Sequence, residues 1–401
     1  MHKQRNIFLA ATFLSLIGYT SFCIYLPAIP DIVSSFHDST KTIKHSLTLF
    51  LLGFSLSQFV WGSLSSKYGR KKTALWGLYL ADIATLSTIL SPNIELFNIA
   101  RFFEGFGIGC TAVLWRTLLT DSIPNRATLT KAVSQISILS NILPGIATIL
   151  GSYLLLFFNW RVIFIFLLIL TTLLLFFIHN IHETNRYIQQ DFSVQNAYAE
   201  YRKSFTHRNF VGYLIPYIVL AGGMVGYNAG ASFIFINHLH TSAQSYSYLL
   251  LLTTLTYIGG TYISAKLTNQ FEQDKIILVG IICSFIPGII YWMLSLSTPL
   301  SLMTVIIPMM IYNLIAGIVT NISNVCAMNE LRGIAGAASA VMCASVYGAS
   351  ALATKLLTEL NLAKLSSLGI YVTALTIVSL ICFYWLILKP KHAKLRNRCA
   401  P

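Results

Sequence analysis

Long apolar stretches alternate with short polar ones from one end of the chain to the other. Each apolar stretch is about 20 residues long, which is the length an α-helix needs to cross the hydrocarbon core of a membrane. The alternating apolar and polar positions of a membrane β-barrel strand are absent. The pattern predicts twelve spanning helices, at about residues 7–27, 45–65, 73–91, 96–119, 131–156, 161–180, 209–236, 246–266, 275–295, 300–324, 334–355 and 368–388.

One polar stretch, residues 181–207, is longer than the others and contains no apolar run of spanning length. It divides the chain into two halves with six predicted spans each. We therefore expect a six-helix bundle over 1–180, a cytoplasmic linker over 181–207 that could hold a surface helix, and a second six-helix bundle with a basic cytoplasmic tail over 208–401. The predicted fold class is an all-α membrane protein with twelve transmembrane helices in two bundles.

The composition agrees with a membrane protein. Of the 401 residues, 55% are hydrophobic and 10% are charged, whereas a soluble domain has about 25% charged residues. The first apolar run ends in YLPAIPD without a small-residue cleavage site, so we expect it to be retained as a span.

The net charge of +14 could indicate nucleic-acid binding, but the positions of the basic residues indicate a different cause. Nearly all of them fall on the side of the membrane that carries both termini. The other side carries only Lys41, Lys44, Arg161, Lys355 and Lys364. Basic loops stay in the cytoplasm, so both termini are predicted to be cytoplasmic. We expect the basic tail to contact membrane lipids and expect no nucleic-acid partner.

No motif predicts an enzyme, a cofactor or a metal site. The seven cysteines are scattered without metal-ligand or disulfide spacing, and we expect them to be reduced core residues. Neither a nucleotide-binding loop nor a Ser/His/Asp arrangement is present, so no catalytic residue is assigned.

Charged residues inside spans are the first candidates for function, because a charge at the bilayer centre costs about 3 to more than 10 kcal/mol. Arg101 and Glu104 are three residues apart and therefore share a helix face. Asp82 lies about nine residues into the third span, or ~14 Å along a helix. Glu104 and Asp82 are the candidate proton-coupling residues, and Arg101 is a candidate for substrate binding. The alternatives are a static Arg101–Glu104 pair and a pair between Asp82 and an arginine that holds helices together.

Several motifs, in this order along the spans, resemble those of the major facilitator superfamily. The loop after the second span, GSLSSKYGRKK, resembles the family's loop signature, with Gly62, Gly69 and Arg70 in place and Ser66 where an acid is usual. Further motifs resemble the Bcr/CflA-like drug/proton antiporter branch. These are YLPAIPDI (25–32), RFFEGFGIG (101–109), WRTLLTD (115–121), LPGIATILGS (143–152) and NWRVIF (159–164).

The resemblance implies the major facilitator fold, in the bacterial inner membrane, with a central cavity that opens alternately to each side. Spans one, four, seven and ten would line this cavity, and the protein would be a monomer. Gly62, Gly69, Arg70, Arg116, Asp121, Pro144 and Gly151 would then serve in gating or loop contacts.

This sequence departs from the branch at its proton carrier. An aspartate usually precedes the tyrosine of YLP by two residues, and here that position is Cys23. Glu104 stands where the branch has glutamine. Cys23 and Tyr25 remain candidates for substrate binding because they lie on a predicted cavity-lining span.

The second half offers neutral polar candidates, since it has no Asp or Glu within a predicted span. Tyr217, Tyr227 and Asn228 in the seventh span and Asn313 in the tenth are the candidate substrate-binding residues. Aromatic rings and amides suit an amphipathic organic ligand, although tyrosines near span ends also serve as interfacial anchors.

Three functions remain open. The first is proton-coupled efflux of an amphipathic small molecule, such as a drug, a siderophore or a metabolite, with that molecule and protons as partners. The second is import or uniport of a small metabolite, including an anionic one attracted by Arg101. The third is a receptor-like protein without transport.

Overall fold

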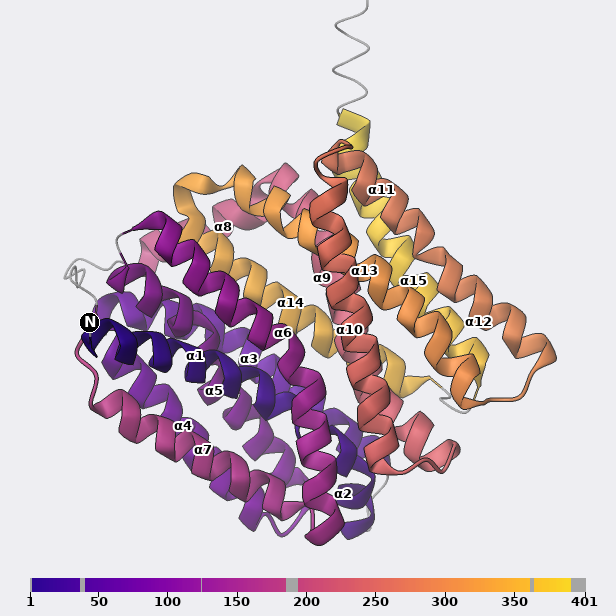
Figure 1. Ribbon diagram of the computed structural model, residues 1–401, viewed down its shortest axis with the longest axis horizontal. Helices are drawn as coiled ribbons and strands as arrows, with labels where there is room; N and C mark the ends of the chain where they lie inside the picture. Colours follow the sequence, from indigo (N-terminus) through magenta and orange to yellow (C-terminus); the bar gives the residue numbers. More distant parts are fainter. Residues whose placement is uncertain (1, 37–39, 124, 185–193, 361–363, 391–401) are drawn as a thin grey trace, which may run out of the picture. The chain divides into compact units, whose positions relative to one another are not determined.

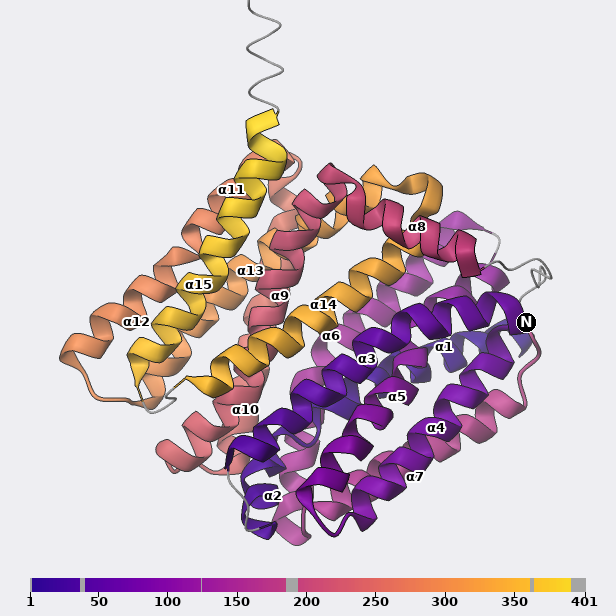
Figure 2. The same cartoon turned by 180° about the vertical axis from the view of Figure 1, so that it is seen from behind.

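The computed structural model describes residues 2–36, 40–123, 125–184, 194–360 and 364–390 (Figures 1 and 2). Within these residues every regular element is a helix, which confirms the all-α class. Each of the twelve predicted apolar runs overlaps one or more helices. The chain divides into two compact units.

The first unit contains the described residues up to Asn196 together with Phe235–Leu251. The end of its first helix follows from the sequence, because Pro27 has no N–H to donate to the carbonyl of Cys23. Its elements are α1 (His2–Cys23), the 3-10 turn η1 (Leu26–Ala28), α2 (Ile29–Ser35), α3 (Thr40–Tyr68), α4 (Arg70–Leu90), α5 (Ile94–Ser122), α6 (Arg126–Phe157) and α7 (Arg161–His179).

The second unit contains Ala197–Ile234 and the described residues from Leu252 onward. Helix α8 lies within the predicted linker, and two π-helical segments, η2 and η4, follow α9 and α15. The elements from the linker onward are α8 (Val194–Thr206), α9 (Arg208–Ser232), η2 (Phe233–His238), α10 (Ala243–Leu267), α11 (Gln273–Cys283), α12 (Phe285–Ser297), α13 (Leu302–Glu330), η3 (Arg332–Ile334), α14 (Ala335–Glu359), α15 (Leu365–Phe383) and η4 (Tyr384–Leu388). The start of α8, most of η2 and the first part of α10 lie in the first unit.

Ten helical segments of the described chain are long and apolar enough to cross a membrane. The predicted runs 96–119 and 246–266 are not among them, although they lie on α5 and α10, which have 29 and 25 residues. Both helices are long enough to span at 1.5 Å per residue. Charged side chains make α5 less apolar, and serine, threonine, tyrosine and glycine do the same in α10.

The predicted run 275–295 is two helices, α11 and α12, that together form one candidate span, Gln273–Ser297. The break at Ser284 has a local cause. Pro287 removes the hydrogen bond to the carbonyl of Cys283, and its ring crowds that carbonyl.

Helix α5 packs against α3, α4 and α1 in the first unit, as Figures 1 and 2 allow the reader to follow. Glycines on two of its faces permit this. A methyl group on Gly105 would overlap the backbone carbonyl of Phe50 in α3, and one on Gly107 would lie 2.6 Å from the backbone nitrogen of Ala81 in α4. The polar residues of α5 are therefore enclosed by helix backbones on both sides.

Residues 235–251, which we call the hairpin segment, include most of η2 and the first part of α10 and belong to the first unit, whereas α9 and the rest of α10 belong to the second. Two side chains of this segment donate hydrogen bonds to backbone carbonyls of α6. The Gln244 amide donates to Ser152 O at 2.8 Å, and the Ser247 hydroxyl donates to Thr148 O at 3.0 Å. The α6 helix thus has polar partners far from it in sequence.

Candidate functional site

An ion pair is buried within α5. The distance from Arg101 Nη1 to Glu104 Oε2 is 2.8 Å, and the two side chains are 0% and 1% exposed. Because the residues lie one helical turn apart, α5 itself brings them together. The predicted pairing of these two charges is therefore present in the structure.

Aromatic rings from α3, from α7 and from the turn before η1 surround the guanidinium of Arg101. Its Cζ lies 4.2 Å from the ring centre of Tyr25, 4.4 Å from that of Phe50 and 5.4 Å from that of Phe164. Ring faces carry negative potential and attract a cation, most strongly where water is excluded. We call Tyr25, Phe50 and Phe164 the aromatic cage.

The buried cluster leaves hydrogen-bonding capacity unused. Among the described residues, Nε and Nη2 of Arg101 and the hydroxyl of Tyr25 have no hydrogen-bond partner, and the contact to Glu104 is not aligned as a hydrogen bond. Unpaired buried polar groups are costly. The cluster thus has donors available for a ligand or a water molecule.

Of the remaining candidates in the first unit, Cys23 lies near the cluster in sequence and Asp82 lies elsewhere. Cys23 is the last residue of α1, 1% exposed, and precedes Tyr25 of the aromatic cage. Asp82 lies on α4 and is held by the hydroxyls of Thr171 and Thr172 in α7. In the described part of the chain it forms no ion pair, so an arginine partner of Asp82 is not observed.

The candidates of the second unit lie on α9 and α13. Tyr227 and Asn313 are fully buried, and neither the Tyr227 hydroxyl nor the Asn313 amide has a hydrogen-bond partner among the described residues. Tyr217 and Asn228 are half-buried on α9. These residues offer neutral donors and acceptors.

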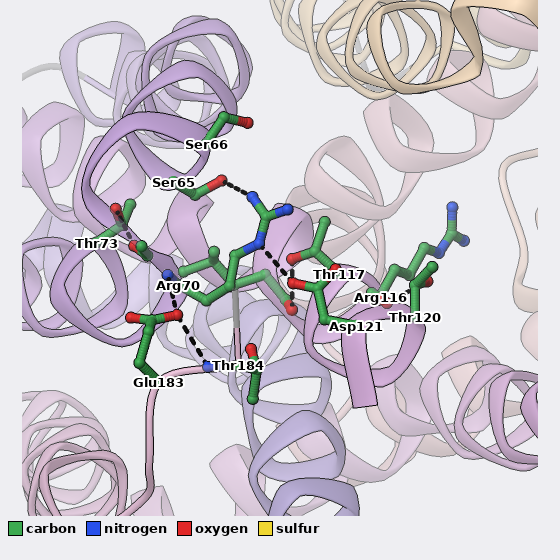
Figure 3. Close-up of polar contacts among 12 residues, drawn as sticks. Ser65, Ser66, Arg70, Thr73, Arg116, Thr117, Thr120, Asp121, Glu183 and Thr184 are labelled. Carbon is green, nitrogen blue, oxygen red and sulfur yellow. Dashed lines mark hydrogen bonds and ion pairs between the residues drawn. The ribbon is translucent and has the colours of Figure 1, made fainter. Parts of the chain in front are cut away.

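Arg70 organises the loop between α3 and α4 (Figure 3). Its Nε donates to Asp121 Oδ2 of α5 at 2.9 Å, and its Nη1 donates to the Ser65 hydroxyl at 2.8 Å. The Ser65 hydroxyl in turn donates to Gly62 O at 2.9 Å. Four positions of the predicted loop signature and α5 end are therefore brought into one cluster.

Glu183, which follows α7, supplies a carboxylate to the start of α4. It accepts a hydrogen bond from the backbone nitrogen of Arg70 at 2.8 Å (Figure 3). It also accepts one from the backbone nitrogen of Lys71 at 3.0 Å. Gly69 precedes them with φ +96°, a conformation that favours glycine, and a side chain there would overlap the Glu183 carboxylate. Because Gly69 cannot cap α4 itself, the helix end takes its acceptor from 113 residues away.

The other predicted gating residues do not join this cluster. Arg116 is exposed on α5, its guanidinium lies 4.9 Å from the ring centre of Trp115, and it points away from Arg70 (Figure 3). Pro144 is inside α6, and a methyl group on Gly151 of α6 would overlap the carbonyl of Ile24. Gly151 thus sets how closely α6 approaches the end of α1.

The described residues contain no group of three or more His, Cys, Asp or Glu side chains that could hold a metal ion. The six described cysteines are free thiols. The candidate site is therefore built from a buried ion pair, aromatic rings and unpaired polar groups.

Long apolar helices with a buried ion pair define the class, a multi-span membrane protein. The family follows from the sequence, because the profile of the Major Facilitator Superfamily matches residues 8–354. The chain belongs to this superfamily, whose members are transporters and not enzymes.

Relatives and a solved structure agree with this assignment. The chain is 23% identical over 394 residues to multidrug resistance protein D of Escherichia coli, covering 98% of this chain and 99% of that protein. It is 22% identical over 295 residues to a bicyclomycin resistance protein homolog of Haemophilus influenzae, covering 72% and 73%. These relatives confirm the resemblance to the Bcr/CflA-like branch. The xylose transporter XylE from E. coli, in a partially occluded inward open conformation, has a TM-score of 0.69 at 13% identity, with 96% and 98% coverage, which shows the fold.

Sequence reasoning missed residues that the fold brings to these sites. Phe50 is one of many apolar residues in its span, and the sequence marks Phe164 only as part of NWRVIF. One feature indicates that α4 needs a capping group such as Glu183 from another segment. The helix begins at a glycine and has no acidic residue in its first turn. A helix start without a capping side chain needs an acceptor from another segment.

Proposed function

We propose that this transporter uses the proton gradient to expel an amphipathic small molecule across the bacterial inner membrane, by alternating access. The observation that carries the proposal is the Arg101–Glu104 pair, buried in α5 and enclosed by the aromatic cage. Glu104 is the proton-coupling residue and Arg101 a substrate-binding residue. The resemblance of the chain to multidrug resistance protein D and the bicyclomycin resistance homolog supports export.

The aromatic cage helps Arg101 to remain buried and charged when Glu104 is protonated. Protonation removes the partner of Arg101, and breaking a buried ion pair typically costs about 3–5 kcal/mol. A desolvated cation on an aromatic face gains about 2 kcal/mol per ring. The two nearer rings, those of Tyr25 and Phe50, stay in contact with Arg101 when Glu104 is protonated, so the guanidinium is not left without favourable contacts. Glu104 can then alternate between carboxylate and acid while Arg101 stays charged.

The direction of coupling follows from the charge of the ligand. A cationic ligand competes with the proton for the Glu104 carboxylate, so binding releases a proton and the two are exchanged. An anionic ligand binds Arg101 best when Glu104 is protonated, so binding takes up a proton and both move the same way. The sign of proton movement on binding thus separates export by exchange from import.

We also propose Tyr217, Tyr227, Asn228 and Asn313 of the second unit as substrate-binding residues, because aromatic rings and neutral amides suit an amphipathic organic ligand. The protein acts as a monomer with twelve spans in two six-helix bundles and both termini in the cytoplasm, and its basic tail contacts anionic lipids. Fluorescent-protein and alkaline-phosphatase fusions at each terminus would test the orientation.

The test is proton release from the purified, full-length protein in weakly buffered detergent solution. Lipophilic cations and polycarboxylates are added to wild type, to Glu104→Gln and to Glu95→Gln, an exposed acid on the same helix as the matched control. We expect lipophilic cations to release protons from wild type and Glu95→Gln but not from Glu104→Gln. Cation binding with equal proton release in Glu104→Gln would contradict the role of Glu104.

The alternative function is import or uniport of a small anionic metabolite. The unpaired Nε and Nη2 of Arg101 favour it, because they can hold a carboxylate, and so does the absence of an acid at Cys23. Proton uptake on adding a polycarboxylate, lost in Glu104→Gln, would replace the export proposal with this one.

A further inference from the structure

Asp82 is a second ionisable group within the membrane region, separate from the Arg101–Glu104 pair. It lies close to the middle of α4, a helix of 21 residues. Its neighbours Tyr79, Ile83 and Leu86 are exposed on the outer face of α4, and Asp82 itself is half-buried where α4 packs against α7. Figures 1 and 2 show α4 and α7 side by side. A bare carboxylate at this depth is strongly unfavourable.

No positive group neutralises Asp82 among the described residues, none of which forms an ion pair with it. Helix α7 carries its cations at the ends, Arg161 and His179. The cations where α3 ends and α4 begins are Lys67, Arg70, Lys71 and Lys72. Helix α5 packs on α4, and its buried charges, Arg101 and Glu104, are paired with each other. The charge of Asp82 therefore needs a neutralising partner that the described side chains do not supply.

The Thr171 hydroxyl beside Asp82 has more acceptors within reach than it has hydrogens. The Thr171 hydroxyl lies within hydrogen-bonding distance of Asp82 Oδ1 and also of Leu167 O, at 3.0 Å, and Leu168 O, at 3.1 Å. The Thr172 hydroxyl donates to Asp82 Oδ2 at 3.0 Å. Each hydroxyl has one hydrogen and two acceptor lone pairs. The single hydrogen of the Thr171 hydroxyl thus faces three acceptor oxygens.

A bound cation resolves both the charge and this shortage. A proton on Asp82 would let the carboxyl group donate to the Thr171 hydroxyl, which would then donate to Leu167 O, as threonines in helices commonly do. A sodium ion would instead find carboxylate and hydroxyl oxygens, the ligands that hard cations take. In either case Asp82 becomes neutral overall and joins α4 to α7.

We propose that Asp82, Thr171 and Thr172 form a binding site for one small monovalent cation, a proton or a sodium ion. This site is independent of the function proposed for Glu104, because it involves a different helix pair and needs no transported ligand. When the cation leaves, the carboxylate charge weakens the α4–α7 contact. Occupancy therefore governs how firmly these two helices are held together.

The first test is infrared spectroscopy of the full-length protein in lipid nanodiscs at neutral pH, without sodium. The carbonyl stretch of a neutral carboxyl group is separate from the bands of a carboxylate. We expect such a band in wild type and in Glu104→Gln, where Glu104 is silent, and its loss in Asp82→Asn. The second test is the thermal unfolding temperature in sodium chloride against choline chloride at equal ionic strength, since a ligand bound only to the folded state raises it.

The outcomes separate the two cations. A neutral-carboxyl band that Asp82→Asn removes assigns the site to a proton. If that band is absent and sodium raises the unfolding temperature of wild type but not of Asp82→Asn, the site takes sodium. If neither signal depends on Asp82, the proposal is overturned.

A milder variant tests the site even if Asp82→Asn does not fold. Thr172→Val keeps the shape of the side chain and removes one hydrogen bond to the carboxyl group. We expect it to shift the frequency of the Asp82 band, or to reduce the sodium-dependent rise in unfolding temperature. Spectra and unfolding temperatures unchanged by Thr172→Val would contradict the site.

Discussion

Arg101 is held by the flat faces of its neighbours as much as by the charge of Glu104. Its Cζ lies 4.2 Å from the ring centre of Tyr25 and 4.4 Å from that of Phe50. A planar guanidinium can stack on such rings while one edge meets a carboxylate. The ammonium group of lysine is compact and strongly hydrated, and cannot do both.

Arg101→Lys should therefore impair the site although it keeps the charge. We expect ligand-induced proton release to fall at least tenfold in initial rate, because the cation no longer stays in the cage when Glu104 is protonated; a loss of about 1.4 kcal/mol is sufficient for that. Stopped-flow measurement with a pH dye would show it. Glu95→Gln, at an exposed position of the same helix, is the control. Equal loss in both variants would mean that α5 as a whole is disturbed.

The position of Gly105 has no room for a larger side chain. A Cβ there would overlap Phe50 O, and Phe50 also stacks on Arg101. Gly105→Val should push α3 from α5, lower the thermal unfolding temperature and weaken ligand binding, since overpacking typically costs about 1–3 kcal/mol. Gly336→Ala, which meets no atom within 4 Å, should change neither. An unfolding temperature unchanged by Gly105→Val would show that the two helices can separate freely.

At the scale of elements, the start of α4 depends on a segment beyond α7. The Glu183 carboxylate accepts from Arg70 N and Lys71 N, next to the contact between Arg70 and Asp121. A carboxylate at a helix N-terminus satisfies free N–H groups and the positive end of the helix dipole.

Glu183→Ala should release this helix end. We expect a loss of about 1 kcal/mol of stability, the usual value for a capping side chain, and faster hydrogen exchange at the amides of Arg70 and Lys71. Hydrogen-exchange mass spectrometry on peptides spanning 69–75 would measure it. Glu183→Gln keeps one acceptor oxygen and should lie between wild type and alanine. Identical exchange in all three proteins would mean that another group caps α4.

Apolar runs predicted the helices well because a membrane helix must satisfy its own backbone and be apolar throughout. The same uniformity hid the break at Ser284 and the π-helical segment η2, since neither changes the apolar run. The pairing of Arg101 with Glu104 was predictable because their spacing is local. The aromatic cage was not predictable in this way. Its rings come from α3, from α7 and from the turn before η1, and residue spacing within α5 does not show how these segments pack around Arg101. The partners of Asp82 depend on which faces of α4 and α7 meet.

At the scale of the whole molecule, the hairpin segment 235–251 ties later sequence to the first unit. An ideal Cβ on Gly145 of α6 would lie 3.1 Å from Leu251 Cβ. Disulfides join residues whose Cβ atoms are about 3.5–4.5 Å apart, so a small adjustment allows one here.

Gly145→Cys with Leu251→Cys, in a background without the native cysteines, should cross-link on oxidation. If transport requires the hairpin segment to part from α6, oxidation should reduce transport to less than a tenth in proteoliposomes, and a reductant should restore it. Each single-cysteine variant controls for the substitutions. A complete cross-link with full transport would show that segment and helix move as one body.

The hairpin segment also limits how the chain can be divided. A gene cut within the 181–207 linker would encode two polypeptides, and the first would contain α6 without Gln244 and Ser247, which donate to its carbonyls. Co-expressed fragments would need to find each other before the first is complete. Chimeras that take their second half from a relative would keep the first unit whole only by retaining the native residues 235–251.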